Sequence, residues 1–406
     1  MRSSEKSANY TELWKDPELL TAIDRISEET DTYPQGQVQS LPIHQRAFIS
    51  DQVKGRFISE LKFTHLAGRT DILYPPSENL EQSSSSLTAS YKASLFGGDL
   101  CLDLTGGFGV DTYYFAKHFD SVVFIEQNQA LYAIAKQNLQ NLGVKNVGFQ
   151  NKSAEEVLKN FDEVADLIYL DPSRRSRGQR LKDLDEYSPK IPEVYNLVNS
   201  KCRNLLIKFS PISDLNFLAQ YVPGNKEIYV LSLKNECKEV LLHCASNLSD
   251  DLKVHCIDLR KNGQISYQFS LSEEKLIPNQ LGRPENYIYL PMTAIVKAGA
   301  YRSLARDYKL KKISNNSHVY TGKYKLPDFP GQSFELISTI RMKKEDFKEK
   351  FNDHSFTVHA RNFHLQPSEI LTKLKLKEGN DLHLIACRDQ MGKTVLLVTK
   401  KLTANE

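Results

Sequence analysis

The chain lacks any long apolar segment. No stretch approaches the roughly 18 uncharged apolar residues of a membrane-spanning helix, and residues 1–20 contain no apolar core of signal-peptide length. We therefore expect a cytoplasmic protein with no membrane partner.

Cysteine is scarce, and metal-ligand spacing is absent from the sequence. Six cysteines occur in 406 residues, and none forms a CxxC pair. The pairs His243-Cys244 and His255-Cys256 lie in alternating, strand-like sequence, where neighbouring side chains point to opposite faces. We expect reduced thiols and no bound metal.

Neither sign of charge is in excess. The 53 Lys and Arg residues against 50 Asp and Glu residues give a net charge of +3, which does not by itself indicate a nucleic-acid partner. A composition of 40% hydrophobic and 25% charged residues excludes a disordered chain. The length exceeds what one hydrophobic core usually holds and therefore predicts two or three domains.

The pattern of short apolar runs predicts four regions: a helical region 1–97, an α/β domain 98–277, a small basic domain 278–332 and an α+β domain 333–406. A serine at Ser85 or Ser86 is a candidate cap for a helix that runs to Leu95. A linker is the alternative for this serine-rich segment.

The second region alternates strand-like and helical runs, which indicates βαβ units and a doubly wound, mostly parallel sheet of about seven strands. Its expected strands are Leu100–Leu104, Ser121–Ile125, Gly148–Asn151, Leu167–Leu170, Asn204–Lys208, Glu227–Ser232 and an antiparallel edge strand Val240–Ala245. The last region reads as strand, helix, strand, helix, strand, strand over Phe334–Ile340, Lys344–Phe351, Phe356–Ala360, Pro367–Leu374, Leu382–Arg388 and Thr394–Thr399.

A glycine-rich loop, Asp103–Thr112, follows the first expected strand and opens a helix. Glycines let the backbone approach a ligand closely, and a helix N-terminus offers unpaired N–H groups. Glu126 ends the second expected strand, 19 residues after Gly107, where a carboxylate can accept the two hydroxyls of a ribose. Together these features predict a ligand that contains adenosine, against the alternative of a glycine-rich turn without a ligand.

The loop is not a dinucleotide fingerprint. The third glycine of G-x-G-x-x-G is replaced by Thr112, and Asp111 would repel a pyrophosphate. The loop resembles the first motif of the class I S-adenosylmethionine-dependent methyltransferases, which have a Rossmann-like fold. The resemblance implies S-adenosyl-L-methionine as cofactor and, as binding residues, Asp103, Thr105, Gly106, Gly107, Gly109, Asp111, Glu126 and Ser153. Capping of a helix is the alternative role for Ser153.

The fourth expected strand runs into Asp171-Pro172-Ser173-Arg174, at the edge where open α/β sheets bind ligands. The segment is similar to the motif of methyltransferases that modify exocyclic amines at Asp171 and Pro172, and departs from it at Ser173 and Arg174. We expect Asp171 to accept hydrogen bonds from the target amine, with a turn cap as the alternative role.

A second chemistry stays open. Lys208 ends the fifth expected strand, and with Lys92, Asp171 and either Glu236 or Glu239 it resembles the Lys-Asp-Lys-Glu set of ribose 2′-O-methyltransferases. A lysine that merely pairs with a carboxylate at the sheet edge is the alternative.

Two basic segments suggest contacts to phosphates. Arg174, Arg175 and Arg177 follow the expected catalytic acid, and residues 297–325, which include Lys309 and Lys312, carry a net charge of +7. Four interleaved tyrosines offer stacking surfaces: Tyr301, Tyr308, Tyr320 and Tyr324. A solvated lysine face of a helix is the alternative.

The chain as a whole resembles a bacterial family of methyltransferases with a ferredoxin-like and a C-terminal THUMP-like domain. The resemblance rests on the glycine loop, the segment after Asp171, Ala298-Gly-Ala and Arg361-Asn-Phe363, and assigns these domains to 278–332 and 333–406. It implies an enzyme of class EC 2.1.1 that modifies RNA, either transfer or ribosomal. A non-catalytic RNA-binding protein and a methyltransferase for small molecules or proteins are the other hypotheses.

Overall fold

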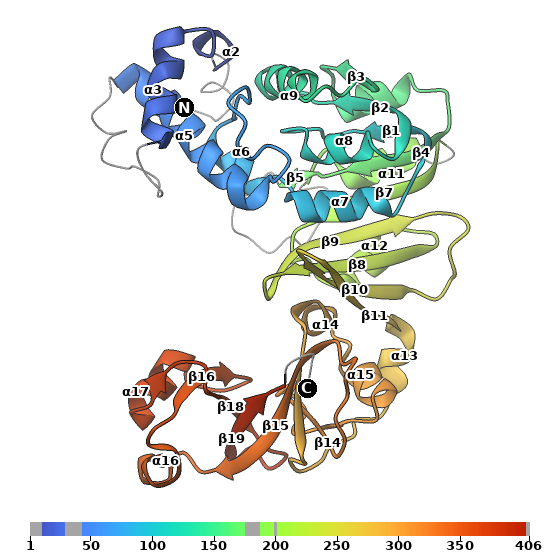
Figure 1. The fold of residues 1–406 in the computed structure, drawn as a ribbon. Coiled ribbons are helices and arrows are strands. Elements are labelled where there is room, and N and C mark those ends of the chain that lie inside the picture. The colour runs from blue at the N-terminus through green and yellow to red at the C-terminus, as the bar shows by residue number, and fades with distance from the viewer. Residues whose placement is uncertain (1–9, 29–42, 175–186, 199–200, 403–406) are drawn as a thin grey trace. The chain divides into compact units, whose positions relative to one another are not determined.

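The computed structural model describes residues 10–28, 43–174, 187–198 and 201–402. The chain divides into two compact units, one made of residues 1–226 with 239–248 and the other of 227–238 with 249–406 (Figure 1). None of the helices in the described ranges has the length and apolar character needed to cross a bilayer.

The sheet of the first unit has the strand order β9-β7-β4-β1-β2-β3. Its strands are β1 (Gly98–Asp103), β2 (Phe119–Ile125), β3 (Val147–Gln150), β4 (Ala165–Leu170), β7 (Cys202–Phe209) and β9 (Glu236–Cys244). The pairs from β3 across to β7 are parallel, whereas β9 is antiparallel to β7. The predicted mostly parallel, Rossmann-like sheet and the antiparallel direction of the strand at Val240–Ala245 are therefore confirmed. The prediction that this strand lies at the edge is wrong, because β9 has a neighbouring strand on each side.

Helices connect these strands as the βαβ pattern predicts. They are α8 (Val110–Phe115), α9 (Gln129–Asn141), α10 (Ala154–Lys159), α11 (Ile191–Val198) and α12 (Leu215–Tyr221). All six residues of β4 are buried, as expected of a central parallel strand covered on both faces. The paired strands β5 (Ser173–Arg174) and β6 (Tyr187–Ser188) follow β4.

The N-terminal region is helical, as predicted. It contains α2 (Tyr10–Leu13), α3 (Pro17–Glu28), α5 (Ile43–Lys62), α6 (Ser77–Gln82) and α7 (Ser86–Ser94). Ser85 caps α7 by accepting a hydrogen bond from the Thr88 N–H, so the capped-helix interpretation is confirmed. One apolar core joins these helices to Phe108 of the glycine loop and Ile134 of α9, which anchors the loop from outside the sheet.

In the second unit, β8 (Lys226–Leu233) pairs in parallel with β10 (Lys253–Arg260), which is antiparallel to β11 (Gly263–Ser270). Sequence reasoning listed β8 as an expected strand and noted strand-like sequence around His255-Cys256 of β10, but it did not list β10 or β11. In β11, the polar residues Gln264, Ser266 and Gln268 alternate with apolar ones, so a strand signal was present there and was not used.

A second sheet has the order β13-β14-β12-β15-β19-β18-β16-β17. Its strands are β12 (Tyr287–Pro291), β13 (Lys311–Lys312), β14 (Tyr320–Gly322), β15 (Gly331–Ile340), β16 (Ser355–Ala360), β17 (Lys377–Glu378), β18 (Leu382–Arg388) and β19 (Thr394–Lys401). The helices of the region are α13 (Leu271–Leu276), α14 (Thr293–Ala298), α15 (Tyr301–Asp307), α16 (Lys344–Phe351) and α17 (Pro367–Leu374).

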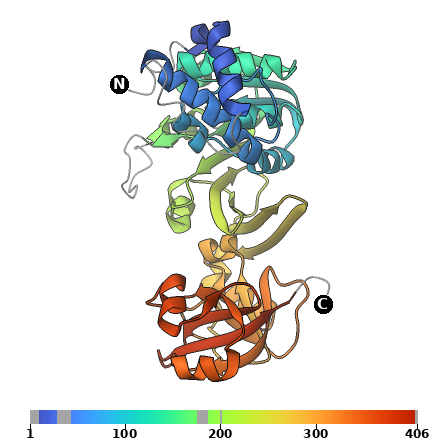
Figure 2. The same ribbon diagram turned by 60° about the vertical axis from the view of Figure 1, so that its left-hand side comes forward.

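The six elements expected after residue 333 all occur in the expected order (Figure 2). The proposed boundary between 332 and 333 falls inside β15, which pairs with β12 on one side and with β19 on the other. Ile288 of β12 and Leu397 of β19 also share one apolar core. The two C-terminal regions are therefore built on one continuous sheet.

Candidate active site

The loop from β1 to α8 needs its glycines for different reasons. A Cβ on Gly106 would lie 2.1 Å from the ring of Phe124, so a side chain there would clash with β2. Gly107 and Gly109 have φ values of +53° and +86°, a left-handed conformation that side chains disfavour. The loop can therefore pass close to β2 and turn into α8, which side chains at these positions would hinder.

The carboxylate of Glu126 lies across this loop. The N–H groups of Gly107 and Asn128 donate to its two oxygens at 3.0 and 2.7 Å. Burial raises the pKa of Glu126, and these N–H donors oppose that rise. Both oxygens are thus fixed at the end of β2, where the sequence predicts an acceptor for a ribose.

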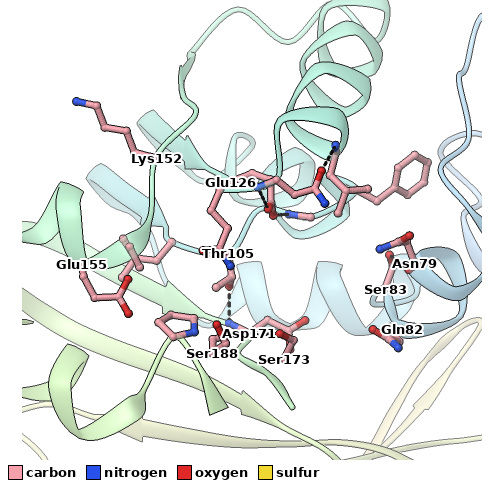
Figure 3. Close-up of a pocket in the computed structure, with 18 residues that line it drawn as sticks. Asn79, Gln82, Ser83, Thr105, Glu126, Lys152, Glu155, Asp171, Ser173 and Ser188 are labelled. Atoms are coloured by element: carbon pink, nitrogen blue, oxygen red, sulfur yellow. Dashed lines mark hydrogen bonds between the residues drawn. The ribbon is translucent and has the colours of Figure 1, made fainter. Parts of the chain in front are cut away.

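A cavity of about 270 Å³ opens between the ends of the parallel strands and α6 (Figure 3). Thr105, Gly107 and Glu126 form one wall, and Asp171 lies at the end of β4. Asn79, Gln82 and Ser83 line the side away from Glu155. The lining contains three carboxylates, those of Glu126, Glu155 and Asp171, and one lysine, Lys152. The excess of negative charge favours a cationic ligand.

Asp103, the last residue of β1, holds the loop in place through two hydrogen bonds. Its Oδ2 accepts a hydrogen bond of 2.5 Å from the Thr112 hydroxyl in α8, and its Oδ1 accepts one of 3.2 Å from the Thr105 N–H. The side chain is buried, and burial raises the pKa of Asp103 to about 7. Asp103 therefore joins strand, loop and helix and does not line the cavity.

Asp171 is the lining carboxylate that lies at the end of β4. Its N–H donates to the Thr105 hydroxyl at 2.6 Å, which ties the end of β4 to the glycine loop. Its Oδ2 pairs with Lys208 Nζ at 2.5 Å, and its side chain remains 30% exposed. Desolvation raises the pKa of Asp171, while Lys208 opposes that rise. One side of this carboxylate is held by a lysine and the other is open to a ligand.

Behind Asp171 lies a buried charge cluster, which consists of Lys92, Asp111, Asp171, Lys208 and Glu239. Lys92 Nζ lies 2.9 Å from Asp111 Oδ1 and 3.0 Å from Glu239 Oε2, and its side chain is fully buried. Burial alone would lower the pKa of Lys208, but the surrounding carboxylates outweigh burial and raise it. Although burial opposes ionisation of Asp111, the two lysines hold its pKa below the usual value.

Two hydroxyl groups link the members of this cluster. Ser84 Oγ accepts from Lys92 at 2.6 Å and from Lys208 at 3.3 Å, and donates to Asp111 at 2.8 Å. The Tyr169 hydroxyl accepts from Lys92 at 3.2 Å and donates to Asp111 at 3.1 Å. Lys92, Lys208 and Asp111 are thus hydrogen-bonded as well as paired, which buried charges require, whereas Glu239 Oε2 has only its ion pair with Lys92.

The cluster gathers the lysines and acids that the sequence suggested as a Lys-Asp-Lys-Glu set. Glu239, 5% exposed, is the glutamate that joins it. Glu236, the other candidate, is exposed and pairs with Lys238.

Other predicted cofactor residues support the cavity from outside its lining. Gly106 and Gly109 shape the loop, Asp111 belongs to the charge cluster, and Ser153 caps α10 by accepting from the Glu156 N–H at 3.2 Å. Like Asp103, these residues do not line the cavity, and their role in binding the cofactor stays a prediction. Pro172 is buried next to Asp171 and does not line the cavity either.

Of the five expected phosphate contacts, the structure describes the side chains of Lys309 and Lys312. The Arg174 side chain, Arg175 and Arg177 lie outside what the structure describes. Lys309 is exposed in the second unit, whereas Lys312 is 2% exposed and donates to the Asn315 carbonyl at 2.6 Å. A buried ammonium cannot reach a phosphate on the surface, which corrects the expectation for Lys312.

Sequence reasoning missed part of the cavity wall. Asn79, Gln82 and Ser83 come from a region without a recognisable motif, and only the tertiary packing of α6 brings them to the glycine loop. Asn128 could have been predicted from the sequence as a helix cap, because an asparagine between a strand and a helix is a common N-cap. Its Oδ1 accepts from the N–H groups of Ala130 and Leu131.

Comparison with known proteins matches three segments to family models: residues 85–185 to "conserved hypothetical protein 95", 287–330 to a ferredoxin-like domain and 331–401 to a THUMP domain-like model. The crystal structure of a "putative methyltransferase" from Porphyromonas gingivalis W83 is 27% identical and superposes with a TM-score of 0.83, covering 96% of this chain and 99% of that one.

Two "uncharacterized S-adenosylmethionine-dependent methyltransferases" of Mycobacterium tuberculosis, from strains CDC 1551 / Oshkosh and ATCC 25618 / H37Rv, are each 22% identical over 320 residues. The match covers 78% of this chain and 84% of each relative. The chain is thus an S-adenosylmethionine-dependent methyltransferase with segments that match ferredoxin-like and THUMP domain-like models.

Proposed function

We propose that this protein transfers a methyl group from S-adenosyl-L-methionine to an amine of a base in transfer or ribosomal RNA. The observation that carries the proposal is the position of Asp171, whose partly exposed carboxylate shares one cavity with the glycine loop and Glu126. A hydrogen-bond acceptor for the target thus stands beside a site suited to adenosine.

The cavity fits this cofactor on three counts. Glu126 presents two fixed carboxylate oxygens that can accept the ribose hydroxyls. Gly107, in a left-handed conformation, leaves the backbone accessible at the cavity wall. The three carboxylates suit a ligand that carries a sulfonium and an ammonium group.

The cofactor supplies an electrophilic methyl group, and the protein supplies position and electrostatics. Asp171 accepts hydrogen bonds from the target amine and directs its lone pair into the cavity. Lys208, at 2.5 Å, holds one carboxylate oxygen and leaves the other for the amine. The proton released by the methylated amine passes to the Asp171 carboxylate or to water.

RNA as the substrate is supported by the match of residues 331–401 to a THUMP domain-like model, because THUMP domains in general accompany RNA-modifying enzymes. The exposed Lys309 and the exposed ring of Tyr324 add a phosphate contact and a stacking surface.

A ribose 2′-hydroxyl is the second candidate target. The buried charge cluster favours it, because it brings Lys92, Lys208, Asp171 and Glu239 together as that chemistry requires. Lys92, however, has no exposed surface, so it would have to be uncovered before it could reach a hydroxyl. This burial is why we place the base amine first.

The test uses total RNA from cells that lack the protein, incubated with labelled cofactor and either wild-type protein or Asp171→Asn. We expect the variant to lose at least about 100-fold in methyl transfer, as for removal of a positioned polar group at a reaction centre. It should keep its affinity for S-adenosylhomocysteine in calorimetry. Asp162→Asn, an exposed acid before β4, is the matched control.

Mass spectrometry of the nucleosides distinguishes the targets. A methylated base supports the first candidate, and a methylated ribose supports the second. Full activity of Asp171→Asn would refute the role of Asp171, and no incorporation by the wild-type protein would favour a non-catalytic RNA-binding protein.

A further inference from the structure

The second unit contains its own cavity, of about 400 Å³. Segments that are far apart in the sequence form its walls, including β10, the β12–α14 connection and the loop after β16. This last loop is Arg361-Asn-Phe363, a motif of the sequence that the proposed methyl transfer does not use. The walls lie in one compact unit, so the cavity is part of its fold.

Arg361 is an unusual cation in this cavity. Burial lowers the pKa of its guanidinium, and among the described residues no carboxylate forms an ion pair with it. Its one side-chain hydrogen bond there is a long donation of 3.4 Å to the neighbouring Ala360 carbonyl. Arg361 is partly buried, and a guanidinium that is partly removed from water without a counterion is suited to bind an anion.

The loop holds Arg361 in place. Its N–H donates to the Ala386 carbonyl of β18 at 2.9 Å, and Phe363 packs against the apolar core of the C-terminal helices. Asn362 between them has a left-handed φ of +49°, which asparagine tolerates better than most residues. The guanidinium is therefore presented by an anchored turn.

Two neutral histidines line the cavity with Arg361. His318 stacks on Tyr301 at 3.8 Å between ring centroids, and its buried Nδ1 has no hydrogen-bond partner. His359 hydrogen-bonds through Nε2 to His383 Nδ1 at 3.0 Å. Burial lowers the pKa of each lining histidine to about 4, with a further contribution from Arg361. Both rings can therefore donate an N–H at neutral pH without carrying charge.

The remaining charges of the cavity leave it positive. Arg260 on the wall pairs with Asp258, and Asp258 Oδ1 also accepts from the Ser232 hydroxyl at 2.7 Å. The one carboxylate of the lining is thus already satisfied, while the charge of Arg361 is not. Met292 and Val296 add an apolar patch to the same walls.

We propose that this cavity binds the phosphate group of a nucleotide, with the Arg361 guanidinium as the main ligand. A guanidinium matches phosphate with two parallel N–H donors. The cavity is larger than a phosphate needs, and Met292 and Val296 can contact the uncharged remainder of a nucleotide. The proposal goes beyond methyl transfer and does not depend on it.

The test is calorimetric titration of the full-length protein with cytidine 5′-monophosphate, with S-adenosylhomocysteine in excess so that the first cavity is occupied. We expect binding of the monophosphate, and binding at least tenfold weaker for cytidine. Arg361→Gln should lose at least tenfold in monophosphate affinity, and Arg361→Lys should lose less. Arg341→Gln, at an exposed arginine directly after β15, should match the wild type.

Thermal unfolding separates a binding role from a structural one. Without ligand, Arg361→Gln should be at least as stable as the wild type, because it removes a partly buried cation that lacks a counterion. Competition by a short oligoribonucleotide would identify RNA as the source of the phosphate, and its failure would identify a free nucleotide; both support the site. No binding of the monophosphate, or equal binding by a folded Arg361→Gln, would overturn the proposal whatever the methyl-transfer assay gives.

Discussion

At the scale of single residues, Glu126 gives the most direct evidence for the cofactor. A buried carboxylate needs donors, and here the N–H groups of Gly107 and Asn128 supply them from two different segments. The same pair of oxygens can also accept hydroxyls, since each oxygen has room for more than one hydrogen bond. Glu126 thus fixes the loop through Gly107 and can also accept hydrogen bonds from the ribose hydroxyls.

Replacement of Glu126 by Gln should weaken S-adenosylhomocysteine binding by about 10- to 100-fold. The change keeps the shape but removes the charge, and hydrogen bonds to charged groups contribute about 1.5–3 kcal/mol each. Calorimetry measures the effect directly, with Glu163→Gln, an exposed acid of the same unit, as control. Unchanged affinity in Glu126→Gln would show that the cofactor does not use this carboxylate.

At the scale of elements, the β1–loop–α8 segment depends on Asp103. This side chain ends the strand and accepts from Thr112 in the helix, so its ionisation affects how the two elements join. Burial raises its pKa to about 7 from 3.8. Because the folded-state pKa lies above the unfolded one, its contribution to stability is complete below about pH 4 and is lost as the pH rises through about 7.

Asp103→Asn, which mimics the protonated acid, should therefore escape this loss. We expect the melting temperature of the variant, minus that of the wild type, to increase between pH 5 and 8 in the absence of cofactor. The melting-temperature difference should grow by about 2–4 °C for each kcal/mol of unfolding free energy that the wild type loses. A difference that stays flat over this range would mean that Asp103 is already ionised at pH 5.

The elements were predictable where their signals are local. β1 to β4 carry apolar runs bounded by turns, and Ser85 with Thr88 has the spacing of a cap. The loop and Glu126 followed from spacing alone. The sequence could not place Gln82 in the cavity wall, because that position depends on how α6 packs. It also could not choose between Glu236 and Glu239 as the partner of Lys92, because that choice depends on how β9 packs. Glu236 and Glu239 are equivalent in sequence, and only the structure shows which one is buried.

At the scale of the whole molecule, part of the +7 of residues 297–325 is taken up by contacts within the protein. Arg306 pairs with Glu273 and Asp307, and Lys311 pairs with Glu285, while Lys312 is buried. Two of these acids lie outside the segment, so no count along the segment could anticipate the pairing. The expected stacking surface is reduced too, since Tyr320 is fully buried and Tyr301 stacks on His318.

We therefore expect only the exposed, unpaired lysines of residues 297–325 to contribute to the salt dependence of RNA binding. Each phosphate contact that is lost lowers the slope of log affinity against log salt concentration by about 0.7–0.9. We expect Lys309→Gln and Lys323→Gln, at two exposed lysines, to reduce the slope by about that amount each. Arg306→Gln and Lys311→Gln should leave it nearly unchanged, because their charges are already paired. Filter binding of transfer RNA between 50 and about 200 mM salt measures the slope, and equal reductions in both pairs of variants would show that the segment binds as the sequence suggested, without regard to its ion pairs.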